Sequence, residues 1–184
     1  MRREILVLWV LGAAAAGGLS CGDPVHDAEV SALGPEPGPY PPGPLHRAGQ
    51  PCLTCHGGLG PASAEFVTAG TVYVNQYMAA TALEPYAPLV GGIINLVDAN
   101  GVVATPAPTT NSVGNFFVTA DQWDPVFPIG GPNASQQISV APAGQATNTT
   151  PMLTHIARGG VYASCAYCHF DPPGPTTPGH VYQN

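Results

Sequence analysis

The chain has 184 residues, enough for one domain of ordinary size with additional segments. Glycine (23 residues) and proline (22 residues) together make up about a quarter of it, so long irregular stretches are expected. Only 8% of the residues are charged, lysine is absent and the formal net charge is −7, which argues against binding to nucleic acid or to acidic membrane surfaces.

Residues 1–20 have the features of an export signal. Arg2 and Arg3 precede an apolar run at 5–16 that is too short to remain as a membrane-spanning helix. Small residues then lead into Cys21, an order that resembles bacterial lipoprotein signals. The resemblance implies lipidation of Cys21 and a periplasmic or outer-surface lipoprotein, anchored to the membrane through its lipid. The alternative is ordinary cleavage after the alanines at 14–16, which would leave Cys21 as a free thiol.

Residues 21–44 are predicted to form a tether. The stretch 22–33 is polar and mixed, and we expect it to be disordered. The stretch 34–44 is so rich in proline and glycine that it favours an extended spacer, which would hold the following domain away from a membrane. A loop packed on the domain is the alternative for this second stretch.

Two pentapeptides carry the strongest chemical signal in the chain, and both have the spacing Cys-x-x-Cys-His. The first contains Cys52, Cys55 and His56, and the second contains Cys165, Cys168 and His169. This spacing is the attachment signature of haem c: two thiols add to the vinyl groups of one haem, and the histidine binds the iron. The sequence therefore predicts two covalent haems, in segments 45–64 and 158–184, with His56 and His169 as proximal ligands.

Two other interpretations of the cysteine pairs remain open. Four thiols in two C-x-x-C pairs are typical of a zinc ribbon, although a ribbon uses a much shorter gap between the pairs. Each pair is also compatible with a redox dithiol, although neither pair begins a helix in a βαβ unit. Glycines at 57, 58 and 60 follow the first motif and would permit a close approach of the backbone to a flat cofactor.

Residues 65–157 change character and are predicted to be β-rich. Short β-branched or aromatic runs are separated by turn residues, and Asn100-Gly101 is a hairpin signal. No helical periodicity is present. The fold is therefore expected to be mainly β: a small antiparallel β-sandwich flanked by irregular haem-binding segments, with little helix outside the signal peptide. Strands are expected at 66–74, 88–97, 102–105, 116–119, 137–140 and 152–156.

The order of motifs in this region resembles the carboxypeptidase regulatory-like domain. The matching residues are Gly70-x-Val72, Pro88 to Gly101 with its paired glycines, and Thr110-x-x-x-Gly114-x-Phe116. The resemblance implies a seven-stranded, transthyretin-like β-sandwich that is non-catalytic and acts as a scaffold or binding module. It covers about half the chain, which departs from the family by an insertion at 76–87 and by weak later strands.

Histidines close to each motif are candidates for the sixth ligand of each iron. His46 precedes the first motif and His155 precedes the second, so the order of histidine and motif is repeated at both ends of the β-rich region. We therefore expect bis-histidine ligation with His46 and His155 as distal ligands. His180 is the main competitor, and His26 is a weaker one.

Together the motifs and the export signal resemble an exported dihaem c-type cytochrome, and electron transfer to and from a redox partner protein or another cytochrome is the expected function. The alternative is an envelope binding or adhesion module in which the haems are sensory or incidental. A haem enzyme such as a peroxidase is a third possibility. No nucleophile–base pair, carboxylate pair or phosphate-binding loop is present, so the protein is not expected to be an enzyme.

Overall fold

The structure is a computed structural model of the whole chain, and it describes residues 23–74, 87–131, 133, 136–170 and 175–183. The predicted export signal and Cys21 lie outside the described residues, as does most of the predicted 76–87 insertion. Within the described ranges, no helix is both long enough and apolar enough to cross a membrane.

The described part of the chain is mainly β with little helix, as the sequence predicts. The strands are β1 (Thr68–Tyr73), β2 (Ile93–Asn95), β3 (Asn115–Val118), β4 (Ser139–Ala141), β5 (Thr150–Pro151) and β6 (Val181–Tyr182). The strands β1 and β2 are shorter than the expected ranges 66–74 and 88–97. The strands expected at 102–105 and 152–156 are wrong: these stretches form only isolated bridges, Val103 with Val97 and Ile156 with Ile129. The helices are α1 (Pro24–Ala32), α2 (Leu53–His56), the 3₁₀ helix η2 (Gly160–Ala163) and α3 (Cys165–Cys168).

The strands form two three-stranded sheets, with the orders β3-β1-β6 and β2-β4-β5. The second sheet is antiparallel throughout, and β1 pairs antiparallel with β3 from Thr68 opposite Val118 to Thr71 opposite Asn115. The sequence did not predict β6, which returns from the proline-rich tail and pairs parallel with β1. The first sheet is therefore mixed.

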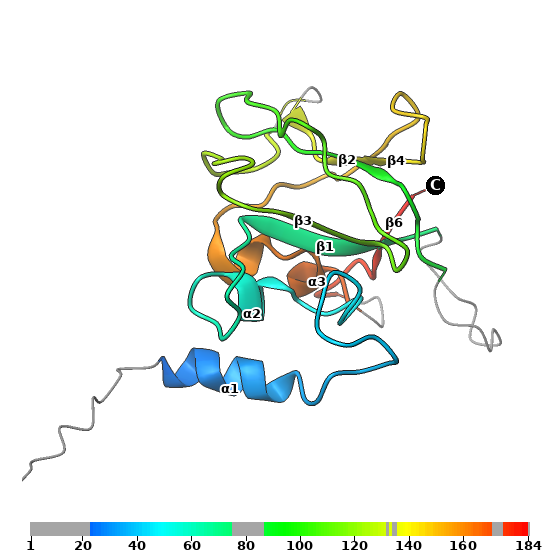
Figure 1. Cartoon of the computed structure of the whole chain (residues 1–184). Helices are drawn as coiled ribbons and strands as arrows, with labels where there is room; N and C mark the ends of the chain where they lie inside the picture. The colour runs from blue at the N-terminus through cyan, green and yellow to red at the C-terminus, as the bar shows by residue number, and fades with distance from the viewer. Residues whose placement is uncertain (1–22, 75–86, 132, 134–135, 171–174, 184) are drawn as a thin grey trace, which may run out of the picture.

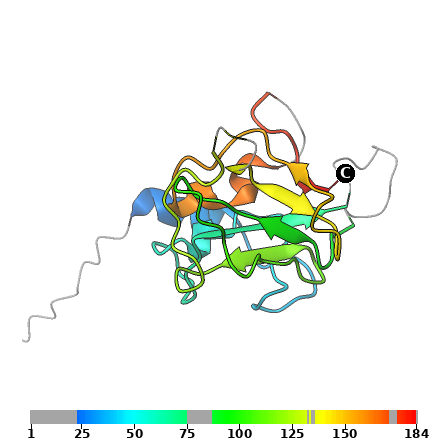
Figure 2. The same cartoon turned by 90° about the horizontal axis from the view of Figure 1, so that it is seen from above.

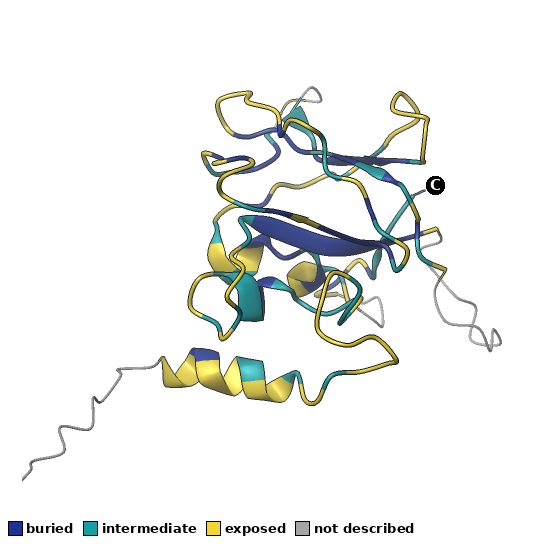
Figure 3. Ribbon diagram, in the orientation of Figure 1, coloured by how far each residue is buried: buried dark blue, intermediate teal, exposed yellow. Residues whose placement is uncertain are grey.

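Strand β1 lies in the middle of the molecule and is covered on both faces. In Figures 1 and 2 the sheet β2-β4-β5 lies over one face of β3-β1, and the helices α2, η2 and α3 lie under the other face. All six residues of β1 are buried, and Figure 3 shows this strand as a continuous buried band. A strand buried on both faces has no reason to alternate apolar and polar residues, which explains the imperfect period of two in its sequence.

A single hydrophobic core joins the two sheets and the first motif. Leu53 of α2 is completely buried in the same cluster as residues from both sheets. The motif segments are thus part of the core and not appendages to it. The cluster includes Leu53, Ala69, Val72, Ile94, Phe116, Val140 and Ile156.

Helix α1 occupies the stretch that the sequence predicts to be disordered. Asp23 is its N-cap, and its carboxylate oxygen Oδ1 accepts hydrogen bonds from the backbone N–H groups of Val25 (3.0 Å) and His26 (3.3 Å). Pro24 stands at the first helical position, where its missing N–H costs nothing. These cap signals are local, and α1 packs against α2, so the expectation of disorder is wrong for residues 24–32.

The proline-rich stretch after α1 is held against the following loop by Arg47. The guanidinium group donates to the carbonyl of Gly34 (2.8 Å), and its Nε lies 3.2 Å from the Glu36 carboxylate. Arg47 has a positive φ of 49°, a conformation that costs about 1 kcal/mol for a non-glycine residue and is here offset by these contacts. The stretch 34–44 is therefore a loop packed on the domain and not an extended spacer.

The predicted turn at 98–101 is confirmed, and Asp98 holds it. Asp98 is 1% exposed, and its carboxylate accepts backbone N–H groups of Asn100 (2.9 Å), Val102 (2.8 Å) and Val126 (3.0 Å). Burial alone would raise the pKa of this carboxyl, but the backbone hydrogen bonds outweigh it and hold the pKa below its ordinary value. The ionised Asp98 therefore connects the turn to the chain near Val126.

Replacing Asp98 with alanine is expected to destabilise the fold by about 3 kcal/mol, because three backbone N–H groups lose a charged acceptor. Since the folded-state pKa is depressed, the contribution of Asp98 is full above the ordinary aspartate pKa of about 4 and is lost as the pH falls through the folded-state value. Denaturant unfolding of both proteins at pH 7 and at acid pH measures this. A difference that stays constant down to the acid limit would contradict it.

Candidate functional site

Each Cys-x-x-Cys-His motif forms one helical turn. In the first, the backbone N–H of His56 donates to the carbonyl of Cys52 (3.0 Å), and in the second that of His169 donates to Cys165 (2.8 Å). Residues three apart in a helix share a face, so the two thiols of each motif lie on the same side of the turn. Two thiols on one side of one turn can reach the two adjacent vinyl groups of one haem.

The residue after the first cysteine anchors each turn in the protein. Leu53 is 0% exposed and Ala166 is 8% exposed, and they occupy the same position in the two motifs. With this side chain directed into the core, the rotation of each turn about its axis is fixed. The thiols and the histidine of each motif are therefore held in place by packing.

The structure brings the two motifs side by side, although 108 residues separate them. Helix α2 packs against η2, which leads directly into α3, and α3 packs against β1. Cys52 lies close enough to Cys165 for a negative charge on one sulfur to raise the pKa of the other. Both cysteines pack against the hydrophobic core.

Strand β1 makes the contacts that join the second motif to the sheet. The Thr68 hydroxyl donates to the carbonyl of Ala163 (2.8 Å), and Ala69 forms a parallel bridge with Ser164. A Cβ added at Gly70 would lie 2.6 Å from both Cβ and Sγ of Cys165, which is far inside van der Waals contact. The absence of a side chain at position 70 is thus what lets the cysteine reach the strand.

The ring of His56 is oriented by its other nitrogen and by an aromatic stack. Its Nδ1 lies 2.7 Å from the carbonyl oxygen of Ala64. Since a carbonyl only accepts hydrogen bonds, Nδ1 carries the proton and the lone pair is on Nε2. One face of the ring stacks on Phe66 (centroids 4.3 Å apart), which in turn stacks on Phe117 of β3 (4.7 Å).

His169 of the second motif has the same arrangement. Its Nδ1 donates to the carbonyl oxygen of Gly179 at 2.9 Å, which again leaves the lone pair on Nε2. Burial lowers the pKa of this histidine, the hydrogen bond to Gly179 opposes that effect, and nearby His180 lowers the pKa further. The neutral ring is therefore favoured, and this is the form that binds metals.

His46 lies beside the first motif. Its ring centroid is 5.9 Å from that of His56, with the two planes at 73°. Its Nδ1 lies 3.5 Å from Oε1 of Glu36, and both of these atoms are buried without a hydrogen-bond partner. The side chain of Asn115 in β3 donates to the carbonyl of His46 (3.0 Å) and so ties this loop to the sheet.

The other predicted ligand, His155, is exposed and next to Ile156, which bridges to Ile129. None of the contacts found among the described residues joins it to either motif. His180 stacks at an angle on Tyr73 of β1 and lies close to His169. His26 of α1 is buried, and its Nε2 has no hydrogen-bond partner.

The thiols do not have the properties of a reactive redox dithiol. Burial raises the pKa of Cys52 to about 11 and that of Cys165 to about 12, and it raises the pKa of Cys55 as well. Reactive dithiols instead have a lowered thiol pKa. All four motif cysteines are free thiols. Among the residues that the structure describes, no group of three or more His, Cys, Asp or Glu side chains is placed to hold a metal ion.

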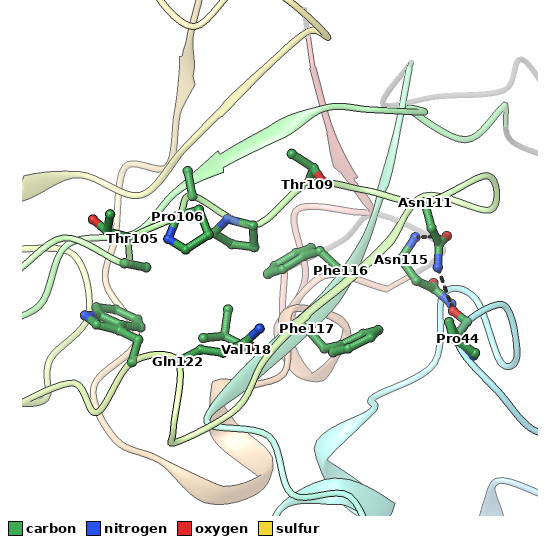
Figure 4. A pocket seen from close by; sticks show the side chains of 14 residues that line it. Pro44, Thr105, Pro106, Thr109, Asn111, Asn115, Phe116, Phe117, Val118 and Gln122 are labelled. Atoms are coloured by element: carbon green, nitrogen blue, oxygen red, sulfur yellow. Dashed lines mark hydrogen bonds between the residues drawn. The ribbon is translucent and has the colours of Figure 1, made fainter.

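A pocket of about 320 Å³ lies beside β3 (Figure 4). Pro106, Phe116 and Trp123 line it, and Pro44 closes one end, where the side chains of Asn111 and Asn115 donate to its carbonyl. Neither the motif cysteines nor any histidine lines this pocket. Two of its lining residues also contact the site: Phe117 belongs to the stack that leads to His56, and Asn115 donates to the carbonyl of His46.

The donor set therefore fits haem c: the two thiols of each motif lie on one side of its turn, and each motif has a histidine whose Nδ1 proton is held by a backbone carbonyl, so that the lone pair is on Nε2. Searches of protein-family models, of curated proteins and of solved structures gave no match to this chain.

Proposed function

We propose that this chain is an exported electron-transfer protein with two covalently attached haems, one on Cys52 and Cys55 and the other on Cys165 and Cys168. A haem attached to these thiols, with its iron bound by His56 or His169, would supply one-electron redox chemistry, so that the protein could accept an electron from a reduced partner and pass it to an oxidised one. The redox partner is a second electron-transfer protein, such as another cytochrome.

The orientation of the two motif histidines carries this proposal. Each has its Nδ1 proton on a backbone carbonyl, Ala64 for His56 and Gly179 for His169. Metal-binding histidines have this arrangement, because the outer hydrogen bond fixes the tautomer and makes the free nitrogen a better ligand. A zinc ribbon or a redox dithiol gives no reason for both histidines to be held in the same way.

The position of His46 supports bis-histidine ligation of the first haem, with His56 as proximal and His46 as distal ligand. Imidazole–metal bonds are about 2 Å long, so two imidazoles that share one ion have ring centres roughly 6 Å apart. The rings of His46 and His56 are 5.9 Å apart. The Glu36 carboxylate beside Nδ1 of His46 would orient this ring as Ala64 orients His56.

The side-by-side placement of the motifs favours electron transfer over an adhesion module with incidental haem. Both attachment turns lie under the same face of β1, with Cys52 near Cys165. Independent sensory haems would not need to be neighbours. We propose that the two sheets are the halves of a carboxypeptidase regulatory-like β-sandwich that serves as the scaffold for this pair, since they share one core.

The experiment that tests the proposal is production of the full chain with a cytochrome c maturation system. Intact-protein mass and the reduced visible spectrum should show two haems that survive acid-acetone extraction, and the purified protein should exchange electrons reversibly with a soluble redox protein. Zinc, or a mass without added haem, would refute it.

We also expect Cys21 to carry the lipid anchor. Cys21→Ser should move the protein from the membrane fraction to the soluble fraction, because two or more acyl chains are needed for stable anchoring. Fractionation and mass spectrometry of the N-terminal peptide measure this. A free Cys21 thiol, or cleavage after residue 16, would contradict it.

A further inference from the structure

Three aromatic rings lie face to face between the first motif and the protein surface. The ring of His56 stacks on Phe66, with centroids 4.3 Å apart and planes at 11°. Phe66 stacks in turn on Phe117, at 4.7 Å and 17°. Phe117 is 38% exposed, whereas the other three residues of β3 are buried. The stack therefore connects a histidine of the first motif to the surface through rings in direct contact.

A pocket lies at the surface end of this stack. Phe117 is one of the residues that line the pocket of about 320 Å³ beside β3 (Figure 4). Asn115, which also lines it, donates to the carbonyl of His46 (3.0 Å). The walls of the pocket therefore touch both histidines that the proposed function places on the first iron.

The pocket is apolar and small. Phe116, Phe117 and Trp123 supply aromatic surface, and none of the 14 residues that line it is charged. Pro106 and Pro108 fix the backbone of one wall, so little ordering is needed when the pocket is filled. Its volume is near the lower limit for small-molecule sites. A space of this size suits an inserted side chain, and side chains buried in such pockets anchor many protein interfaces.

The rim of the pocket is acidic. Asp121 and Asp124 are exposed and flank Gln122 and Trp123, which line the pocket. No ion pair within the described ranges neutralises either carboxylate. The chain has no lysine, and its formal net charge is −7. Complementary charges speed the encounter of two proteins, so this face favours a partner whose contact surface is basic.

We propose that Phe117 and this pocket form the docking site for the redox partner, a basic electron-transfer protein that inserts an apolar side chain into the pocket. This inference rests on the proposed function and adds to it the surface and the charge of the partner. The step transfers one electron and no atom or proton: the partner is oxidised, and the ferric iron bound by His56 becomes ferrous. The stacked rings leave no solvent between the docked partner and the ring of His56.

Electron transfer from a reduced, lysine-rich soluble cytochrome to the oxidised two-haem protein tests the site by stopped-flow spectroscopy. Phe117→Ala should lower the second-order rate constant about tenfold, because it removes the end of the stack and part of the pocket wall. Phe117→Tyr should keep the rate, whereas Phe117→Leu, which has an apolar side chain without a ring, should not. Phe170→Ala is the matched control, since Phe170 is 39% exposed but lies outside the stack and the pocket, and it should leave the rate unchanged. The ferric spectrum and the reduction potential of the first haem should be the same in all four variants.

The charge of the rim is tested separately. Asp121→Asn combined with Asp124→Asn should slow the reaction about threefold to tenfold at low ionic strength, and the difference should vanish at high salt. Asp27→Asn combined with Glu29→Gln removes the same two charges from α1, outside the pocket, and should have a much smaller effect. A faster reaction with an acidic flavodoxin than with the lysine-rich cytochrome would overturn the charge assigned to the partner.

The outcomes distinguish this inference from the function on which it rests. A protein that acquires no covalent haem refutes the proposed function. Two haems with an unchanged rate in Phe117→Ala refute the inference alone, as does an equal loss of rate in Phe170→Ala. A loss of rate in Phe117→Ala with 2-methyl-1,4-naphthoquinol as the reductant, but not with the cytochrome, would assign the pocket to a small neutral molecule and overturn protein docking.

Discussion

Alanine at both Cys52 and Cys55 is expected to reduce the covalently bound haem from two groups to one, and alanine at both Cys165 and Cys168 should do the same. Each motif is a separate helical turn with its own thiols and its own oriented histidine, so each attachment is self-contained. Intact mass after acid-acetone extraction counts the haems directly. Loss of both haems from either variant would contradict the independence of the motifs.

Leu53→Ala is the control for this experiment because it changes the same turn without removing a ligand or a thiol. Leu53 is completely buried, so its truncation should cost about 2–5 kcal/mol of folding free energy. The motif chemistry is intact, so two haems should still be attached. A variant with two haems and a lowered melting temperature separates packing from attachment, whereas a missing haem would show that attachment needs the folded core.

Gly70→Ala is expected to destabilise the fold and to displace the second motif. The added Cβ would lie 2.6 Å from Cβ and Sγ of Cys165 and 3.2 Å from a ring carbon of Phe116. Overpacking of this kind costs about 1–3 kcal/mol, and the relief must come from a displaced second motif, since β1 is paired on both sides. We expect a lower melting temperature and a changed spectrum of the second haem only.

Gly101→Ala is the matched control for this variant. Its added Cβ would meet nothing within 4 Å, but its φ of +80° is unfavourable for alanine and should cost about 1 kcal/mol. Both variants should therefore be less stable, and only Gly70→Ala should alter a haem spectrum. Equal spectra in the two variants would show that the contact between β1 and Cys165 does not position the second motif.

Local signals were sufficient to predict the mainly β character and the turn at Asp98, because β-branched runs and an Asn-Gly step act over a few residues. A local signal was also present for α1, since Asp23 is a favourable N-cap and Pro24 suits the first helical position. However, no apolar stripe accompanies this signal along the helix. The helix was missed because its buried residue is a histidine. A buried polar residue is invisible to a search for apolar periodicity.

Other features depend on contacts between distant residues, and no local pattern encodes them. The neighbouring position of the motifs depends on β1 being buried on both faces and on Gly70 admitting Cys165. The packing of the proline-rich stretch depends on Arg47, which meets Gly34 and Glu36. Strand β6 has two residues and lies in a tail rich in proline, so its composition predicts a loop.

The contact between Gly70 and Cys165 has a consequence for the order of events in biogenesis. Under the proposed function the sulfur of Cys165 reacts with haem, and this sulfur lies against a central strand. A chain that completed this contact first would therefore hide the thiol from the maturation machinery. Residues 95 apart join here, and such long-range contacts form late in folding. We therefore expect the thiol of Cys165 to stay accessible for haem attachment until late in folding, because its contact with Gly70 forms late.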